Sequence, residues 1–277
     1  MNFNNILNAI AEQDPEVFEK VSERRDVIKN FTRKVSLVAL PFAVGSLFNK
    51  AYGKSTDIII DTLNFALTLE ILEAAFYNQG LASSSLAIPA SDRPAFVTIS
   101  THENAHVAFL TNTINSLSGT PVSLASFTID LTAGGAFADV LSNYSTFLAV
   151  SQTFEDTGVR AYKGQAANLM GNSAILGAAL QIHSVEARHA AHIREIRALA
   201  GASVSPWITG NQSGITGAAG TAVQPSYNGE DNTTQAGVNI ATIKSGAVAL
   251  NANSASEAFD EPLDKAAVVA IVTPFIH

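Results

Sequence analysis

Residues 102–106 read His-Glu-Asn-Ala-His, and residues 183–189 read His-Ser-Val-Glu-Ala-Arg-His. Both stretches contain a glutamate that is followed, three residues later, by a histidine. These pairs are Glu103/His106 and Glu186/His189. On an α-helix a spacing of three places two side chains on one face, so each pair can bind a single metal ion. The two stretches therefore predict a helical core that holds metal.

Four long stretches carry apolar residues at the helical period. They are residues 55–79, 91–117, 136–169 and 172–200. Short turns join the first stretch to the second and the third to the fourth, so each pair is expected to be antiparallel. Residues 118–135 between the second and third have a strand-like middle at residues 127–131, and they can extend over about 55–60 Å. The predicted fold is therefore all-α, a four-helix bundle with one long crossover.

The chain divides into three parts by composition. They are a leader (residues 1–54), the bundle (residues 55–201) and a loop-rich C-terminal extension (residues 202–277). Up to residue 256 the extension is rich in Gly, Ala, Ser, Thr and Asn and has only three charged residues. Such a segment lacks long periodicity and is expected to form loops with short strands. Residues 263–277 are expected to form one short apolar helix that stops at Pro274.

The leader resembles an export signal. Residues 22–29, Ser-Glu-Arg-Arg-Asp-Val-Ile-Lys, are similar to a twin-arginine motif. The apolar run from Val35 to Phe48 has about the length of a signal-peptide core and is too short to span a bilayer stably. The leader therefore predicts an exported, periplasmic protein without a stable membrane span. The alternative is an amphipathic N-terminal helix that packs on the body of a cytoplasmic protein.

The composition excludes several kinds of site. The chain has 277 residues, is 47% hydrophobic and only 14% charged, and contains no cysteine. Without cysteine it can form no disulfide, thiolate metal site, iron–sulfur cluster or cysteine nucleophile. The formal net charge of −8 argues against nucleic acid as a partner, because phosphate binding needs basic clusters.

Two further glutamates extend the metal-binding pattern. Glu70 lies in the apolar sequence of residues 67–72, where an unpaired carboxylate is costly. Glu155 lies in the third helical stretch. A tyrosine follows each of these glutamates after seven residues, at Tyr77 and Tyr162. The body thus repeats, in each helix pair, a glutamate, a tyrosine, a turn and a Glu-x-x-His pair.

Helix geometry places the glutamates of each pair at matching levels. At a rise of about 1.5 Å per residue, Glu70 lies about 14 Å before the end of its helix and Glu103 about 17 Å after the start of the next. In the second pair both distances are about 20 Å. Four carboxylates gathered in one core cannot all stay ionised without countercharge, so two metal cations are expected among them.

The predicted metal ligands are Glu70, Glu103, His106, Glu155, Glu186 and His189. Glu103 and Glu186 are expected to bridge two ions, the other two glutamates to bind at the ends, and each histidine to bind one ion. Carboxylate and imidazole ligands favour two iron or manganese ions, with zinc as a further option.

Residues 67–77, Leu-Thr-Leu-Glu-Ile-Leu-Glu-Ala-Ala-Phe-Tyr, together with the repeated glutamates and histidines, resemble the ferritin-like di-metal carboxylate family. With Glu261-Pro262-Leu263 and Thr273-Pro274-Phe275, they are similar to an exported group of that family related to plant desiccation-related proteins. The resemblance covers residues 57–201 and, more weakly, the extension. It implies a bundle, a di-metal site and chemistry with oxygen or peroxide, such as oxidising iron or removing peroxide in stress protection. An oxidoreductase of the ferroxidase or peroxidase type and a homo-oligomer are both compatible with this family.

Two other functions stay open. His102, Glu103 and His106 form His-Glu-x-x-His, the metalloprotease motif in which two histidines bind zinc and the glutamate activates water. That interpretation leaves Glu70, Glu155 and the second Glu-x-x-His pair unexplained. The other function is a non-catalytic structural or stress-protective bundle that keeps its metal for stability.

Three residues lie close to the predicted ligands without joining them. Glu73 rivals Glu70 as a ligand, but the tyrosine spacing that Glu70 shares with Glu155 favours Glu70. Asp156 points in another direction on a helix and is not expected to bind metal. Gly158 either distorts its helix beside the metals or allows close helix packing.

The remaining histidines and the two tyrosines have supporting roles in this scheme. His102, His183 and His192 are expected to support the ligands or to lie at the surface. Tyr77 and Tyr162 either pack in the core or hydrogen-bond the site.

Overall fold

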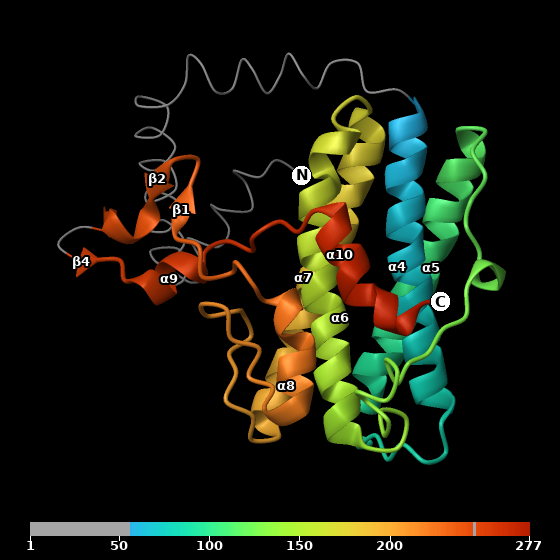
Figure 1. Ribbon diagram of the computed structural model, residues 1–277, viewed down its shortest axis with the longest axis horizontal. Coiled ribbons are helices and arrows are strands. Elements are labelled where there is room, and N and C mark those ends of the chain that lie inside the picture. Colours follow the sequence, from blue (N-terminus) through green and yellow to red (C-terminus); the bar gives the residue numbers. More distant parts are fainter. Residues whose placement is uncertain (1–55, 246–247) are drawn as a thin grey trace, which may run out of the picture. The chain divides into compact units, whose positions relative to one another are not determined.

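A computed structural model describes residues 56–245 and 248–277 (Figure 1). The predicted leader and its twin-arginine-like motif lie outside the described residues. Within the described ranges, no helix combines the length and the hydropathy that a membrane span requires.

Four long helices build the body of the protein. They are α4 (Thr56–Ala82), α5 (Arg93–Ser116), α6 (Tyr144–Gln165) and α7 (Ser173–Leu199). α4 packs against α5, α6 packs against α7, and α4 also contacts α6, so the four helices lie side by side (Figure 1). The prediction of an all-α helix bundle is confirmed.

Side-chain caps set the starts of α6 and α7. Asn143 accepts hydrogen bonds from the backbone N–H groups of Ser145 and Thr146. Asn172 accepts one from the N–H of Ile175. These bonds satisfy amides that have no partner in the first turn of a helix.

The third helix is shorter than its apolar pattern predicts. It begins at Tyr144, so the predicted start at residue 136 is wrong. Residues 133–135 all have positive φ angles, a conformation outside the right-handed helix, and turns follow them. Phe137 and Val140 are nevertheless buried, so their spacing reflects the packing of turns against the core.

The crossover between α5 and α6 pairs with the C-terminus of the chain. Ile129 forms an isolated antiparallel bridge with Ile276. The backbone N–H of Thr128 donates to the carbonyl oxygen of His277 at 2.7 Å, and the N–H of His277 donates back at 2.9 Å. The strand-like sequence in the crossover thus finds its partner at the far end of the sequence.

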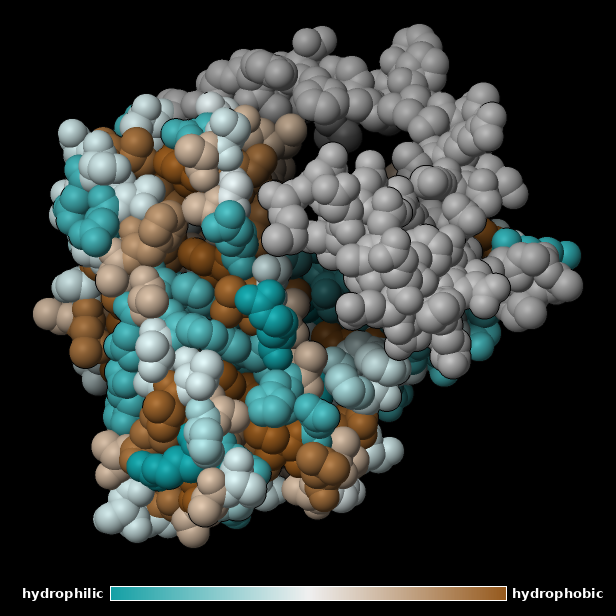
Figure 2. All heavy atoms as spheres, turned by 180° about the vertical axis from the view of Figure 1, so that it is seen from behind, coloured by the Kyte–Doolittle hydropathy of each residue, from teal (hydrophilic) through white to brown (hydrophobic). Residues whose placement is uncertain are grey.

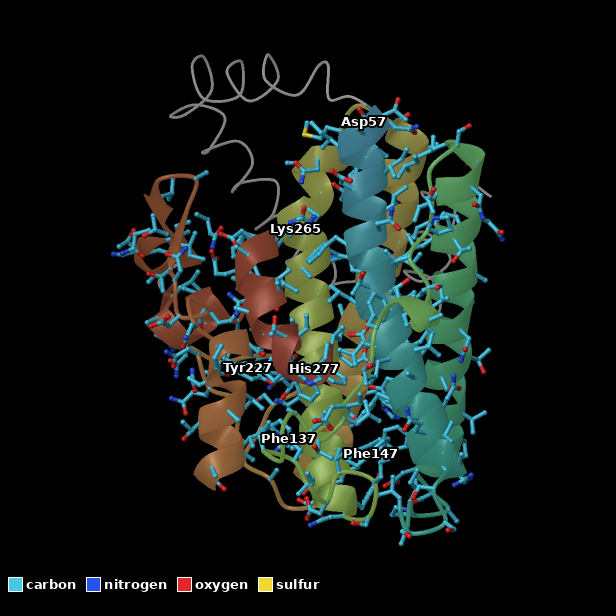
Figure 3. The ribbon with its side chains drawn as sticks, turned by 45° about the vertical axis from the view of Figure 1, so that its right-hand side comes forward. Asp57, Phe137, Phe147, Tyr227, Lys265 and His277 are labelled. Atoms are coloured by element: carbon cyan, nitrogen blue, oxygen red, sulfur yellow. The ribbon has the colours of Figure 1, made fainter. Side chains whose placement is uncertain are left out.

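The last segment of the chain packs on the bundle. It consists of α10 (Lys265–Val272) and the 3-10 helix η5 (Thr273–Phe275), and α10 contacts α6. Figure 3 labels Lys265, where this segment begins, and His277, which lies just beyond it. The expected short apolar helix is present, and it ends before Pro274.

The rest of the extension is made of short elements. They are the helices α8 (Gly217–Val223) and α9 (Ala252–Ser256), the 3-10 helices η3 (Gln224–Ser226) and η4 (Ile240–Thr242), and the strands β1 (Thr234–Gln235), β2 (Val238–Asn239), β3 (Lys244–Ser245) and β4 (Val248–Ala249). β1 and β2 form an antiparallel hairpin, and β3 neighbours β4 in a second small sheet. Two more 3-10 helices, η1 (Leu124–Ser126) and η2 (Ala166–Leu169), lie in the crossover and after α6.

Buried charges attach the extension to α6 and α7. Arg194 of α7 forms a bidentate ion pair with Asp156 of α6, with Nη2 2.6 Å from Oδ2. Tyr227 of the extension donates to the same carboxylate at 2.8 Å, at the junction with the bundle that Figure 3 shows. Arg160 of α6 pairs with Glu230 of the extension, and both side chains are 1% exposed. These ion pairs hold the extension on the bundle. Because they are buried, water does not screen them.

Aromatic rings fill the core on one side of the bundle centre. Phe76 stacks on Phe147 with ring centroids 4.7 Å apart and meets Phe154 edge-on at 5.2 Å. Tyr77 meets both Phe76 and Phe147 edge-on. This close packing fixes the direction of the Tyr77 ring.

The outer face of the bundle mixes polar and apolar residues in small patches (Figure 2). Large apolar side chains that are partly exposed include Val97, Phe109 and Leu180. Single exposed apolar side chains are common on protein surfaces and need no special role.

Candidate metal centre

The centre of the bundle gathers six buried side chains from its four long helices. They are Glu70 of α4, Glu103 and His106 of α5, Glu155 of α6, and Glu186 and His189 of α7. All four glutamates are 0% exposed. The structure thus brings together all six residues that the sequence predicts as ligands, and their binding of metal stays a prediction.

Two overlapping groups of candidate ligand atoms form within this cluster. They are Glu70, Glu103, His106 and Glu186, and Glu103, Glu155, Glu186 and His189. In each group the ligand atoms lie within 4.8 Å of one another. Metal–ligand bonds of about 2.0–2.3 Å place opposite ligands of one ion about 4–4.6 Å apart, so each group has the size of one coordination sphere. Glu103 and Glu186 belong to both groups, as expected for bridging carboxylates.

Each histidine turns its Nδ1 atom toward the carboxylates. Nδ1 of His106 lies 3.1 Å from Oε2 of Glu70 and 3.1 Å from Oε2 of Glu103. Nδ1 of His189 lies 2.9 Å from Oε1 of Glu103 and 3.2 Å from Oε2 of Glu155. One imidazole nitrogen therefore faces each group, next to a terminal and a shared glutamate.

Three buried oxygens of the cluster have no hydrogen bond. They are Oε1 of Glu103 and both carboxylate oxygens of Glu186. Histidine Nδ1 atoms approach Oε1 of Glu103 to 2.9 Å and Oε1 of Glu186 to 3.2 Å, but without hydrogen-bond geometry. Buried carboxylate oxygens without partners are costly. Cations would supply the missing partners at the two residues that both groups share, so the donor set fits a pair of metal ions.

Two tyrosines cross the bundle to the predicted terminal glutamates. The hydroxyl of Tyr77 on α4 donates to Oε1 of Glu155 on α6. The hydroxyl of Tyr162 on α6 donates to Oε1 of Glu70 on α4. Of the two roles that the sequence leaves open, the tyrosines thus take the hydrogen-bonding one. Each terminal carboxylate has one oxygen held by a tyrosine and the other near a histidine.

Glu73 is a fifth buried glutamate beside the cluster. It is 4% exposed, and burial, together with repulsion by Glu186, raises its pKa well above 4.5. A Cβ atom at Gly158 would lie 3.3 Å from Oε2 of Glu186 and 3.4 Å from Oε1 of Glu73. Gly158 therefore leaves room for two carboxylates within an uninterrupted helix. Glu73 belongs to neither ligand group, whereas Glu70 belongs to one.

Burial raises the pKa values of Glu70, Glu155 and Glu186, and the neighbouring glutamates raise those of both histidines. Burial raises the pKa of Glu70 from 4.5 to about 7, against a smaller lowering by the hydrogen bond from His106. Burial lowers the pKa of His106, but its contacts with the glutamates outweigh this and raise the pKa to about 12. Burial also lowers the pKa of His189. The charge of Glu155 and the other contacts with glutamates outweigh this and raise the pKa to about 11. An incoming metal ion must displace these protons.

The metal-free protein is expected to become less stable as the pH rises. The pKa of Glu70 is about 7 in the folded state against 4.5, so its contribution is full below pH 4.5 and is lost as the pH rises through 7. The pKa values of His106 and His189 are about 12 and 11 against 6.5, so their contribution is full below pH 6.5 and declines as the pH rises toward those values.

Metal binding is expected to have the opposite pH dependence, because the ligands must lose protons to bind. Urea unfolding between about pH 5 and pH 9, with chelator and with Mn²⁺, measures both trends. The metal-free free energy of unfolding should fall over this range while the increment from Mn²⁺ grows. A metal-free free energy of unfolding that rises instead would contradict the pKa shifts.

His102 lies behind His189, outside both ligand groups. Its Nδ1 is 2.9 Å from Nε2 of His189, and the two rings stack with centroids 5.2 Å apart. Nδ1 of His106 faces the glutamates instead. The geometry favours the di-metal interpretation over the metalloprotease one, in which His102 and His106 would share a zinc ion.

His102 is placed to fix the tautomer of His189. A metal ion on Nδ1 of His189 requires the proton on Nε2, and this N–H then donates to Nδ1 of His102. We expect His102→Ala to lower the affinity for one of the two ions by about 10- to 100-fold, while two ions still bind at saturation. Isothermal titration with Mn²⁺ measures this, with the exposed His192 of α7, changed to Ala, as the matched control. An equal loss of affinity for both ions, or no loss for either, would argue against the role of His102.

Asp156, His183 and His192, which the sequence does not predict to bind metal, belong to neither ligand group. Asp156 points to Arg194, away from the cluster that its neighbour joins. His192 is exposed and pairs with Glu195 at 3.2 Å. His183 is half-buried, and burial lowers its pKa.

The ion pairs that join bundle and extension are not predicted by the sequence analysis. The sequence carries a signal for Glu230, which is one of only three charged residues between 202 and 256. Isolated charges in uncharged surroundings need a partner when they are buried. Their spacing does not say which partner each one finds.

Comparison with known proteins agrees with this geometry. A family model described as a ferritin-like domain matches residues 59–199, about half of the chain. No curated protein matches the chain. The matched residues run through all four long helices and include every member of the two ligand groups. The chain belongs to the ferritin-like domain family.

Proposed function

We propose that this protein binds two iron or manganese ions in the bundle and uses them in stress protection, by oxidising iron with oxygen or peroxide or by removing peroxide. The observation that carries the proposal is the pair of ligand groups that share Glu103 and Glu186. Membership of the ferritin-like family supports metal binding at these groups. Hard carboxylate and borderline imidazole ligands suit iron and manganese.

The residues of the site would divide the work as follows. Glu103 and Glu186 would bridge the ions, and each histidine would bind one ion through Nδ1. Tyr77 and Tyr162 would hold the terminal carboxylates in place through their hydroxyl groups. Two bound ions would supply two electrons, which with two protons reduce one peroxide molecule to two water molecules.

Glu73 is suited to hold one of these protons. Its raised pKa favours the protonated carboxyl group, and Glu73 lies beside Glu186 without belonging to a ligand group. A protonated carboxyl group next to a reacting centre can act as a general acid.

Metal content per chain tests the proposal. We expect about two iron or manganese ions per chain by plasma mass spectrometry, after purification without added metal or chelator. The loaded protein should then consume oxygen or peroxide, and protein stripped with chelator should not. About one zinc ion per chain would favour the metalloprotease function. No metal, with no uptake of added Fe²⁺, would favour a structural bundle.

We also propose that the protein is exported and belongs to the group related to plant desiccation-related proteins. The twin-arginine-like residues 22–29 and the apolar run behind them support export. Replacing Arg24 and Arg25 by lysine is expected to keep the protein in the cytoplasm, as measured by cell fractionation. Equal amounts of both forms outside the cytoplasm would contradict this route.

A further inference from the structure

A second concave site lies in the extension, apart from the metal centre. It is a hollow of about 500 Å³ between the loop that follows α7 and helix α9. The residues of interest on its walls are Ser203, Ser205, Trp207, Gln212 and Asn253, with Arg194 among the remaining lining residues. None of the six predicted metal ligands lines this hollow.

Hydrogen bonds join the two walls of the hollow. The backbone N–H of Gly210 in the loop donates to Oγ of Ser256 in α9 at 2.9 Å. Oγ1 of Thr209 donates to Oε1 of Glu257 at 2.6 Å. Nη1 of the buried Arg194 donates to the carbonyl oxygen of Trp207 at 3.4 Å. The hollow is therefore a preformed feature of the fold rather than a gap between free loops.

Trp207 is the main apolar surface of the hollow. It is the single tryptophan of the chain and is 52% exposed. An indole ring offers a flat apolar face of large area, which gains free energy when a ligand covers it.

The polar side chains around this ring are free to bind. Ser203, Ser205, Gln212 and Asn253 make no side-chain hydrogen bond within the described residues. Hydroxyl and carboxamide groups can each donate and accept, so together they match a ligand that does both.

The hollow offers no free charge of its own. Among the residues that the structure describes, the only charged one on its walls is Arg194, which is 1% exposed and whose guanidinium is occupied by the carboxylate of Asp156. A phosphorylated or carboxylate ligand would need an unpaired cation here.

We propose that this hollow binds a neutral saccharide. A pyranose ring has one face of C–H groups that can pack on the indole of Trp207, and its hydroxyl groups can donate to and accept from the serine, glutamine and asparagine side chains. The volume of about 500 Å³ falls in the range of small-molecule sites and is large enough for one or two sugar rings. The proposal is independent of what the metal centre does.

The single tryptophan makes the test direct, because all indole fluorescence of the chain comes from this site. We expect titration of the full chain with maltose, cellobiose and N-acetylglucosamine oligomers to give a saturable blue shift with at least one of them. Inorganic phosphate and ADP should give none. No change with any saccharide up to about 50 mM, or a change with phosphate or ADP alone, would overturn the proposal.

Substitutions of the lining residues test whether the saccharide binds in this hollow. Asn253→Ala and Gln212→Ala are each expected to raise the dissociation constant of the saccharide about fivefold, the size of one hydrogen bond, with Asn112→Ala on α5 as the matched control. Trp207→Ala should abolish binding by isothermal titration, and its urea midpoint shows that it folds. Saccharide binding that survives Trp207→Ala unchanged would place the ligand elsewhere.

Discussion

Glu186→Gln is expected to abolish binding of at least one metal ion and, in the same chain, to stabilise the metal-free protein. Both carboxylate oxygens of Glu186 lack a hydrogen bond, and the side chain is 0% exposed. Burial, and then repulsion by Glu70 and Glu155, raises its pKa well above 4.5. Glutamine keeps the shape and removes the negative charge. The metal-free free energy of unfolding should therefore rise by an amount of the order of 1–3 kcal/mol.

The gain reverses when metal is present. At a hundredfold excess over the dissociation constant, each ion adds about 2.7 kcal/mol to the free energy of unfolding, and the variant loses at least one such increment. Chemical unfolding with and without Mn²⁺, together with plasma mass spectrometry, measures both effects. Glu195→Gln, at an exposed glutamate of α7, is the control.

The two halves of this prediction fail separately. If Glu186→Gln and Glu103→Gln both keep the metal content of the wild-type chain, the predicted ligand set is wrong. If metal-free Glu186→Gln is less stable than wild type, the buried carboxylate of Glu186 does not destabilise the metal-free protein.

Asp156→Ala is expected to destabilise the protein by about 3–5 kcal/mol. The change leaves the guanidinium of Arg194, 1% exposed, without its bidentate partner. The hydroxyl of Tyr227 loses its acceptor as well. Since Tyr227 belongs to the extension, the extension should also become sensitive to proteases.

Urea unfolding of the metal-free chains measures the loss, and a double variant separates charge from packing. Asp156→Leu combined with Arg194→Met removes both charges, so it should recover most of the stability. A loss below about 1 kcal/mol for Asp156→Ala would mean that water reaches the ion pair and screens it.

Local helical geometry made much of the centre predictable. The spacing of three in Glu103/His106 and Glu186/His189 puts each pair on one face, whatever the rest of the chain does. The rise per residue sets the levels at which Glu70 and Glu155 meet them. These rules depend only on neighbours in the chain, and the structure brings the same residues together.

Local rules failed where turns imitate a helix. Phe137 and Val140 have a helical spacing and are buried, but positive φ angles at residues 133–135 and the Asn143 cap delay the start of α6 to residue 144. Spacing reports which residues are buried, and it does not report the backbone path that buries them.

The sequence by itself determined that four long helices form, which glutamates and histidines pair on them, and the levels at which these residues meet. Only the tertiary structure decided that Tyr77 holds Glu155, that His102 backs His189, and that Arg160 finds Glu230. The physical reason is that helical periodicity fixes a side chain's direction relative to its own helix axis. A partner on another segment depends on how helices rotate and pack against each other, and that is a property of the whole core.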